Sequence, residues 1–311
     1  MKLAFLFPGQ GSQYPGMFQD FFQEFKEVRE LLSLCSQHLK IDLESLMFYG
    51  TKEELQKTSQ SQLAIFMMSI GILKALEISY PMLHPSICAG LSLGEYSALY
   101  ASGKIELLSC LDLVKKRGAL MQTASELNPG GLSVVLGLET DVVEKVILDL
   151  DEVWIANLNC PLQVVLSGTH EGLKKAEIIL RENGAKRVIP LDVSGAFHSG
   201  LMHYAQIELK PSIEGALIKE TPIDLVMNVS GEIVKDVNSI KNGLINQVTS
   251  TTRWEKSIST IERSKVDAYL EIGPGKTLSG MNRKIGVKVP TFSIEHIKDL
   301  SELKKIALQN V

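Results

Sequence analysis

Residues 86–99 of the chain read SICAGLSLGEYSAL, and positions 90–94 within them form a complete G-x-S-x-G motif. The apolar residues before the motif predict a short buried strand, and the residues from Glu95 onward can begin a helix. A tight turn between a strand and a helix raises a serine hydroxyl clear of the sheet, and the glycines leave room for the turn and for a substrate. The stretch therefore predicts an α/β fold with Ser92 as a nucleophile; the alternative is a chance pentapeptide in a glycine-rich turn.

Main-chain N–H groups near this turn can stabilise a negatively charged oxygen. The N–H of Leu93 lies at the start of the expected helix, whose positive end faces a developing oxyanion. Residues 7–13, FPGQGSQ, form a glycine-rich loop whose N–H groups can supply a second donor. A dinucleotide site is the rival interpretation, but Tyr14 stands where the third glycine is required. Residues 273–277, GPGKT, imitate the end of a P-loop, but Leu270 replaces its first glycine, so neither nucleotide site is predicted.

A nucleophilic serine requires a base, and the chain offers the six histidines His38, His84, His170, His198, His203 and His296. Most of them stand in polar or proline-flanked segments typical of solvated surface. His198 lies in a loop of small residues at 193–199, between two expected structural units, where a cleft is expected. His296 competes with it, because the serine, acid, histidine order of α/β-hydrolases places the base late in the chain. The context of the loop favours His198.

Residues 132–191 predict a small sheet of their own. Hydrophobic periodicity there predicts a strand, a helix, two strands, a helix and a strand, at 132–138, 140–150, 153–157, 163–167, 171–183 and 186–191. This β-α-β-β-α-β order, entered through the breaker NPGG at 128–131, is that of a ferredoxin-like unit. We therefore expect an inserted small domain at 128–195.

The segments on either side of this insertion predict one α/β core at 1–127 and 196–311. Strands are expected at 3–7, 86–89, 223–229, 268–272 and 289–292. Helices are expected at 17–39, 60–77 and 106–126 and from near 200, 239, 253 and 277. Strands that alternate with helices in this way predict a mostly parallel sheet.

Composition narrows the class of protein. With 311 residues, of which 45% are apolar and 22% charged, the chain has the composition of a globular protein. A net charge of −4 argues against a nucleic-acid partner, and four cysteines without C-x-x-C spacing argue against a metal or redox site. Residues 1–7 are too short for a secretory signal, and the longest apolar stretch, 63–76, is shorter than the roughly 20 residues that span a bilayer. We expect a cytoplasmic protein with no membrane partner.

Five motifs in order resemble the malonyl-CoA:acyl carrier protein transacylases, acyltransferases that load malonyl groups for fatty acid synthesis. They are FPGQGSQ at 7–13, GLSLGEY at 90–96, KRG at 116–118, GAFHS at 195–199 and EIGPG at 271–275. The resemblance runs nearly from end to end. It implies a hydrolase-like core with a ferredoxin-like insert, malonyl-CoA and acyl carrier protein as partners, and no cofactor or metal. We also expect a monomer.

Carried over residue by residue, the resemblance implies a role for five positions. It makes Ser92 the nucleophile and His198 its base, which decides between the two candidate histidines. It places the oxyanion hole at the main-chain N–H groups of Gln10 and Leu93. The third member of the triad is a neutral group in this family, and Gln247 matches it through contacts that orient the histidine.

The resemblance also implies how the acyl group is chosen. Arg117 matches the residue that pairs with the malonyl carboxylate, and a planar permanent cation holds a carboxylate bidentately. Without the resemblance, an arginine in solvent would be the favoured interpretation. Phe197 matches a bulky residue that crowds an α-methyl branch; it can also be a core aromatic residue, and the two interpretations are compatible. The chain departs from the family at Leu91, where a histidine is common, and at Leu162, where a glycine is frequent.

The resemblance implies a ping-pong transfer of malonyl from malonyl-CoA through a malonyl-serine ester to the phosphopantetheine thiol of acyl carrier protein. An acyltransferase of polyketide assembly, a serine thioesterase or hydrolase, and a scaffold protein are the alternatives. Acyl carrier proteins are acidic, so we expect a local basic patch despite the net charge. The basic pairs at 115–116 and 186–187 are candidates for it, with plain solvated surface as the alternative for each.

Overall fold

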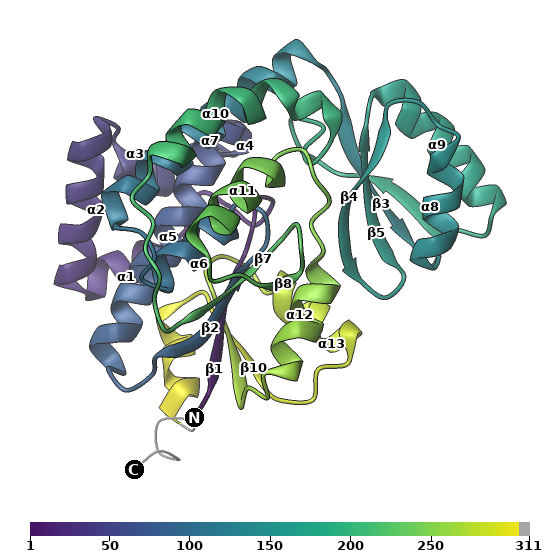
Figure 1. The fold of residues 1–311 in the computed structure, drawn as a ribbon. Helices are drawn as coiled ribbons and strands as arrows, with labels where there is room; N and C mark the ends of the chain where they lie inside the picture. The colour runs from purple at the N-terminus through teal and green to yellow at the C-terminus, as the bar shows by residue number, and fades with distance from the viewer. Residues whose placement is uncertain (305–311) are drawn as a thin grey trace.

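The protein, seen here in a computed structural model that describes residues 1–304, contains two sheets that lie beside each other (Figure 1). The larger sheet has six strands in the order β10-β9-β1-β2-β7-β8. Its strands are β1 Leu3–Phe7, β2 Pro85–Gly90, β7 Asp224–Met227, β8 Glu232–Ile233, β9 Ala268–Ile272 and β10 Thr291–Ile294. All neighbours in it pair in parallel except β7 and β8. The predicted α/β fold with a mostly parallel sheet is therefore confirmed.

Strand β1 shows how the sequence produces the layers. All five of its residues are buried, as expected for a parallel strand with helices on both faces of its sheet. Leu3, Phe5 and Phe7 pack into the larger hydrophobic cluster, whereas Ala4 and Leu6 pack into a second cluster on the opposite face. Successive side chains of a strand point to opposite faces, so one short apolar run contributes to both layers.

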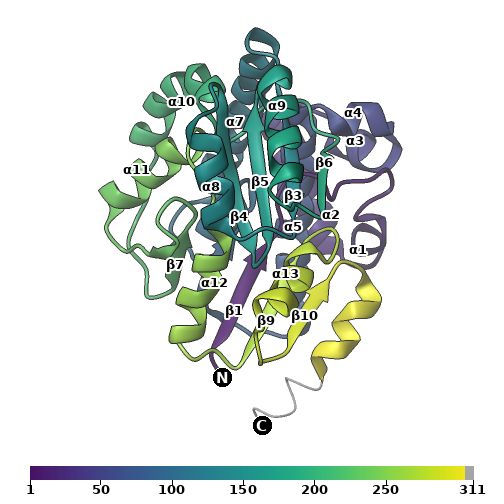
Figure 2. The ribbon, with the colours of Figure 1, turned by 90° about the vertical axis from the view of Figure 1, so that its right-hand side faces the viewer.

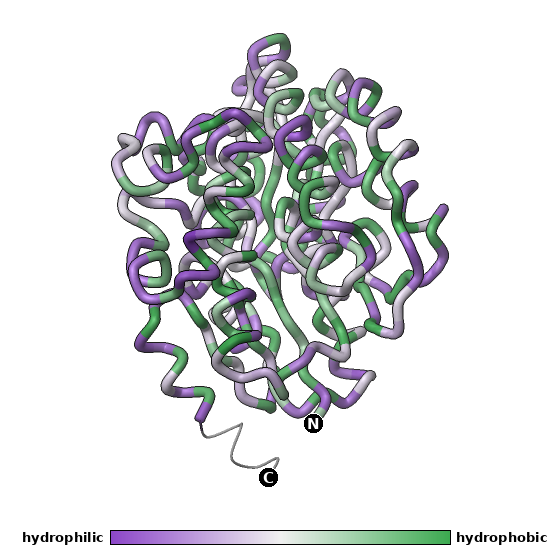
Figure 3. The backbone as a smooth tube through the Cα atoms, turned by 90° about the vertical axis from the view of Figure 1, so that its left-hand side faces the viewer, coloured by the Kyte–Doolittle hydropathy of each residue, from purple (hydrophilic) through white to green (hydrophobic). Residues whose placement is uncertain are grey.

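Helices cover both faces of this sheet (Figure 1). The apolar segments run mainly through the middle of the molecule (Figure 3). The helices are α1 Gln19–Glu24, α2 Lys26–Leu39, α3 Leu43–Tyr49, α4 Lys52–Gln56, α5 Thr58–Ser79, α6 Gly94–Ala101, α7 Leu107–Leu127, α10 His203–Gly215, α11 Val237–Gln247, α12 Trp254–Arg263 and α13 Thr277–Ile285. Two 3-10 helices, Gly200–Met202 and Ile297–Leu303, complete them. Helix α5 is long and apolar enough to cross a membrane, but 83% of its most apolar window is buried within the molecule, which is typical of a core helix.

The observed helices differ from the predicted ones in two respects. The single helix expected at 17–39 is two helices, because Phe25 adopts an extended conformation with φ −102° and ψ 119°. Two short helices, α3 and α4, were not predicted. Side-chain caps begin both: Asp42 accepts from the Ser45 N–H, and Thr51 forms a capping box with Glu54.

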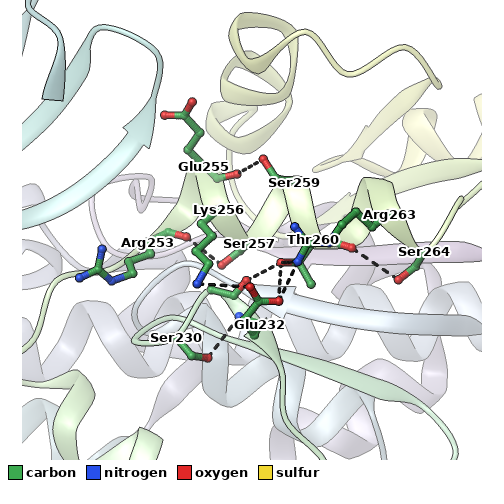
Figure 4. Close-up of polar contacts among 11 residues, drawn as sticks. Ser230, Glu232, Arg253, Glu255, Lys256, Ser257, Ser259, Thr260, Arg263 and Ser264 are labelled. Carbon is green, nitrogen blue, oxygen red and sulfur yellow. Dashed lines mark hydrogen bonds and ion pairs between the residues drawn. The ribbon is translucent and has the colours of Figure 1, made fainter. Parts of the chain in front are cut away.

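Strand β8 was also not predicted, because its two residues form no apolar run; it pairs antiparallel with β7, and side chains of α12 support it. Glu232 of β8 forms ion pairs with Lys256, at 3.2 Å, and with Arg263, at 2.8 Å, both on α12 (Figure 4). The hydroxyl of Thr260, one turn along the same helix, donates to the Glu232 carboxylate at 3.1 Å. A strand of two residues depends on such contacts with a neighbouring element.

The smaller sheet has four strands in the order β4-β5-β3-β6, all paired antiparallel. Its strands are β3 Gly131–Leu136, β4 Val153–Cys160, β5 Gln163–Gly168 and β6 Arg187–Pro190, and its helices are α8 Thr140–Leu148 and α9 His170–Glu182. In Figure 2 both helices lie in front of this sheet. Val135 and Val164 pack against the helices, whereas Val134 and Val165 face the larger hydrophobic cluster. The elements follow the predicted order. The face of this sheet that α8 and α9 leave uncovered, called its free face below, lies toward the larger hydrophobic cluster.

Candidate active site

The G-x-S-x-G segment forms a sharp turn between β2 and α6. Ser92 has a φ of 52°, a left-handed conformation that is costly for a residue with a side chain. A Cβ on Gly90 would collide with the Gly94 carbonyl, and a Cβ on Gly94 would collide with the Phe7 carbonyl of β1. Both glycines are therefore required by the close approach of neighbouring backbone. The turn holds the Ser92 side chain at the carboxyl end of a parallel sheet, where α/β folds place their ligands.

The pairing of β1 with β2 brings the first loop to the same place. Phe7 lies opposite Gly90 in the parallel register, so the loop that begins at Pro8 and the turn that contains Ser92 leave the same edge of the sheet. The main-chain N–H groups of Gln10 and Leu93 have no acceptor among residues 1–304. Both residues line one cavity with Ser92. Two unused N–H donors beside a serine are the arrangement that an oxyanion hole requires.

His198 lies against Ser92 although 106 residues separate them. Its Nε2 is 2.8 Å from Ser92 Oγ, and its Nδ1 is 2.8 Å from the main-chain oxygen of Gln247. A carbonyl oxygen can only accept, so Nδ1 carries the proton and Nε2 is free to accept from the serine hydroxyl. Burial, and then the positive charge of Arg117, lower the pKa of His198 to about 4, so the ring is neutral at pH 7.

His296, the competing histidine, lies away from this cluster. Its side chain is 42% exposed and is 3.5 Å from the carboxylate of Asp20. It precedes the 3-10 helix at Ile297–Leu303, where Asp299 accepts from its main-chain N–H at 2.8 Å. The structure therefore places His198, and not His296, beside the serine.

Arg117 is buried within α7, with 1% of its surface exposed. One terminal nitrogen donates to Ser92 Oγ at 3.0 Å and to Gln247 Oε1 at 2.9 Å, and the other donates to Gln62 Oε1 at 2.7 Å. Its guanidinium carbon lies 5.5 Å from the centre of the Tyr96 ring. Within residues 1–304 it forms no ion pair, and its Nε has no hydrogen-bond partner.

A buried cation that neutral amides and an aromatic ring hold is suited to an anionic ligand, because burial of an unpaired charge is costly. The neighbouring lysines differ from it. Lys115 donates to the Leu39 carbonyl at 3.1 Å and Lys116 donates to Ser212 at 2.7 Å, both on the outer side of α7. The interpretation of Arg117 as a solvated arginine was wrong.

Gln247, the last residue of α11, forms hydrogen bonds to the site through both its main chain and its side chain. Its carbonyl oxygen accepts from His198, as described above. Its side-chain Nε2 donates to the main-chain oxygen of Ser92 at 2.8 Å and to Glu95 Oε2 at 2.6 Å. The contact with the histidine is therefore made by the main chain, and the amide side chain joins the serine turn to Arg117.

The cavity beside these residues has a volume of about 270 Å³ and lies between the larger sheet and the free face of the smaller one. Phe197, which is buried, and Leu91 both line it. From the smaller sheet, Asn159 lines it with an Oδ1 that has no hydrogen-bond partner among the described residues. Leu162 does not line it: this residue has a φ of 61° in the turn between β4 and β5, a left-handed conformation that glycine adopts without steric cost.

Three residues of this cluster were missed by the sequence analysis: Gln62, Glu95 and Asn228. Glu95 is fully buried, and this burial raises its pKa to about 7 against the opposing effect of hydrogen bonds from Asn228 and Gln247. A signal existed for Asn228, which directly follows the parallel strand β7 beside β2 and so lies at the edge of the sheet where ligands bind. No signal in the sequence separated Gln62 from other polar residues of α5.

The turn, its histidine and its buried arginine have the arrangement that covalent transfer of an acyl group requires, and a comparison with known families identifies the class. Residues 4–281 match the family model described as "Acyl transferase domain", and the chain therefore belongs to the acyl transferase family.

Curated relatives narrow this class. The chain is 39% identical over 297 residues to the malonyl CoA-acyl carrier protein transacylase of Bacillus subtilis, covering 94% of this chain and 93% of that protein. It is 33% identical over 307 residues to the protein of the same name from Haemophilus influenzae, covering 98% of each. The resemblance found in the sequence is confirmed.

Solved structures agree with the sequence relatives. The malonyl CoA-acyl carrier protein transacylase from Clostridium perfringens superposes with a TM-score of 0.94 at 37% identity, covering 100% of this chain and 98% of that chain. A malonyl-transacylase in complex with a type II PKS acyl-carrier protein superposes with a TM-score of 0.93 at 33% identity, covering 100% of both chains.

Proposed function

We propose that the protein transfers a malonyl group from malonyl-CoA to the phosphopantetheine thiol of acyl carrier protein, and so supplies fatty acid synthesis. The observation that carries the proposal is the set of contacts made by the Ser92 hydroxyl: its Oγ lies 2.8 Å from His198 Nε2 and 3.0 Å from a terminal nitrogen of Arg117. Arg117 is buried and has no ion-pair partner among residues 1–304. A nucleophile, a base and a cation for the far end of a dicarboxylic acyl group thus meet at one point. The named activity of the relatives supports the same reaction.

The reaction follows from these positions in two half-reactions. His198 Nε2 accepts the Ser92 proton while Oγ attacks the thioester carbon, and the N–H groups of Gln10 and Leu93 donate to the oxygen that becomes negative. When the carbon–sulfur bond breaks, His198 returns the proton to the leaving thiolate of coenzyme A. The thiol of the carrier protein then gives its proton to His198, and its sulfur attacks the carbonyl carbon of the malonyl-serine ester. The bond from that carbon to Ser92 Oγ breaks, and His198 returns the proton to Oγ.

Two further residues shape the acyl site in this proposal. Gln247 orients the histidine, because its carbonyl oxygen holds the Nδ1–H and so leaves Nε2 facing the serine. Phe197 precedes the histidine and lines the cavity, where its ring would crowd an α-methyl branch on the acyl group. Leu91 lines the same cavity with an aliphatic side chain, which offers the acyl group no hydrogen bond there.

Replacement of Arg117 should separate malonyl from acetyl donors. For Arg117→Ala we expect kcat/KM with malonyl-CoA to fall by about 10²–10³-fold, because the malonyl carboxylate would lie in a buried cavity without its cation. The loss with acetyl-CoA should be much smaller, because acetyl has no carboxylate. Steady-state rates with both donors check this, and Lys116→Ala, which removes a cation on the solvent side of the same helix, is the matched control. Equal losses on both donors would contradict the role in carboxylate binding.

For the architecture, we infer a hydrolase-like core at 1–127 and 196–311 and a ferredoxin-like insert at 128–195. Support comes from the separate antiparallel sheet and its own hydrophobic cluster with α8 and α9. The last part of the expected core, residues 305–311, lies outside the described residues. The cavity between the two sheets is the place where this proposal puts the acyl group and the pantetheine arm, shielded from water.

The proposal names two partners, malonyl-CoA and acyl carrier protein, and it places the protein in the cytoplasm as a monomer. The reaction uses no cofactor or metal. Lys186 and Arg187 are exposed at the start of β6 and are available to an acidic carrier protein. Lys115 and Lys116 already donate to groups of α2 and α10 and are the weaker candidates.

A labelling experiment tests the function. Enzyme incubated with radiolabelled malonyl-CoA should carry covalent label, and the label should move to holo acyl carrier protein when that acceptor is added. Fast release of free malonate without an acceptor would instead identify a hydrolase or thioesterase. Absence of both covalent label and malonate release would indicate a scaffold protein without this activity. Parallel assays with carrier proteins of fatty acid and polyketide synthesis decide which pathway is supplied.

A further inference from the structure

The turn that carries Ser92 is held by side chains from other parts of the chain. The Ser92 N–H donates to Asn228 Oδ1 at 2.7 Å, and the Ser92 carbonyl accepts from Gln247 Nε2 at 2.8 Å. Ser92 stands in a left-handed conformation, which costs free energy on the order of 1–2 kcal/mol. Such a conformation persists only where surrounding contacts enforce it. These two amides are therefore the contacts that hold the strained residue on both sides.

Asn228 is bonded at both ends of its amide. Its Oδ1 accepts from Ser92, and its Nδ2 donates to the Gly90 carbonyl at 2.7 Å. Each end meets a main-chain group that permits one role only, so the orientation of the amide is defined by its partners. An aspartate of the same shape would place an oxygen against the Gly90 carbonyl. Asn228 thus fits the turn as an amide and not merely as a small polar residue.

Glu95, on the first turn of α6, accepts hydrogen bonds from both Asn228 and Gln247. Its side chain is fully buried, its Oε1 accepts from the Asn228 main-chain N–H at 2.6 Å, and its Oε2 accepts from Gln247 Nε2 at 2.6 Å. Both oxygens therefore face N–H donors, which match the carboxylate form. This one side chain ties the start of α6 to the end of β7 and the end of α11.

We propose that Glu95 and Asn228 are positioning residues of the acyl transfer, which hold the Ser92 turn and Gln247 so that the serine hydroxyl stays within reach of His198 and Arg117. This inference rests on the proposed function. Neither residue lines the cavity, so neither touches the substrate. Asn228 acts directly on the turn, through its bonds to Ser92 and Gly90. Glu95 acts through Asn228 and through Gln247, whose carbonyl holds His198 at 2.8 Å and whose side chain holds Arg117 at 2.9 Å.

Two variants of unchanged shape test the proposal. Glu95→Gln replaces one acceptor oxygen with a donor that faces another donor, and Asn228→Asp replaces the donor to Gly90 with an acceptor. We expect each to lower kcat for the acylation of Ser92 by about 10²-fold, since displacement of reacting groups by about 1 Å costs that much. KM for malonyl-CoA should stay within about threefold, because Arg117 and the cavity remain. Assays at pH 8 keep Glu95 ionised in the parent protein, where its pKa is raised to about 7.

Glu271→Gln is the matched control. Glu271 is also a fully buried glutamate that accepts from two main-chain N–H groups, those of Leu278 and Ser279, but it has no contact with the serine turn. Its replacement should lower the free energy of unfolding while the acylation rate stays within about threefold of the parent. An equal loss of rate in this control would overturn the proposal, because any buried carboxylate would then have the same effect.

A second measurement does not depend on the reaction. Hydrogen–deuterium exchange of the peptide that contains Ser92 should be faster in both variants, because the Asn228 side chain that accepts from the Ser92 N–H is no longer fixed: Asn228→Asp loses its bond to the Gly90 carbonyl, and Glu95→Gln weakens the contact that holds the Asn228 main chain. Unchanged exchange together with a parental acylation rate would overturn the proposal and leave the proposed function intact. If the parent protein forms no malonyl-serine, the proposed function fails, and the exchange rates still decide whether these residues hold the turn. If Glu95→Gln does not fold, Asn228→Asp alone decides.

Discussion

Ser92→Ala is expected to abolish both the covalent malonyl adduct and the transfer of malonyl to acyl carrier protein. The alanine lacks the oxygen that forms the ester, and no other hydroxyl among the residues that line the cavity has a histidine within hydrogen-bond distance. Removal of a nucleophile from such a unit lowers the rate by about 10⁴-fold or more. Mass spectrometry of the donor-treated protein and the steady-state transfer rate measure the two effects.

Ser97→Ala provides the control for this experiment. Ser97 is fully buried on α6, the helix that follows the serine turn, and its hydroxyl has no hydrogen-bond partner within the described residues. The same chemical change at that position should leave both the adduct and the transfer rate close to those of the parent. If Ser92→Ala is labelled as fully as the parent, the assignment of the nucleophile is wrong.

His198→Asn is expected to lower the transfer rate by about 10²–10⁴-fold, the usual contribution of a general base. Asparagine is the preferred replacement because His198 has a φ of 58°, a left-handed conformation that asparagine tolerates better than alanine does. The loss should appear in kcat for both half-reactions, because the same nitrogen accepts the serine proton and later the thiol proton. His296→Asn, on the exposed competing histidine, is the matched control. An equal loss in that control would contradict the assignment of His198 as the general base and favour His296.

The same variant has a consequence for stability at low pH. The pKa of His198 in the folded protein, about 4, lies below its ordinary value of 6.5 because burial disfavours the charged ring. The unfolded chain therefore takes up a proton first, and the free energy of unfolding falls as the pH drops from 6.5 toward 4. His198→Asn removes this contribution, so its stability should depend less on pH in that window. Urea unfolding at several pH values measures the difference.

Local patterns predicted much of the fold because their causes are local. The apolar run of β1 and the alternation in β3 to β6 identify strands, since burial acts on neighbouring residues with a fixed period. The long helix predicted at 17–39 failed for the opposite reason. A single extended residue, Phe25, breaks it, and hydrophobic periodicity carries no information about one backbone angle. Strand β8 was missed because two residues are too few to show a period, and the side-chain contacts that support it come from α12, about 30 residues later in the chain.

By itself, the sequence determined the nucleophile turn and the order of the elements, because glycine spacing and apolar periodicity act within a few residues. The context of its loop favoured His198 and the motif resemblance then decided for it, whereas Arg117 was selected by the resemblance alone. Only the tertiary structure decided that His198 and Arg117 both contact the Ser92 hydroxyl and that Arg117 is buried. It also decided that Asn228 bonds to the serine turn and that Glu95 bonds to Asn228. The side chains that hydrogen-bond to Ser92 come from residues 25 to 155 positions away along the chain, and their distances depend on how the sheet and its helices pack. No local pattern specifies that packing.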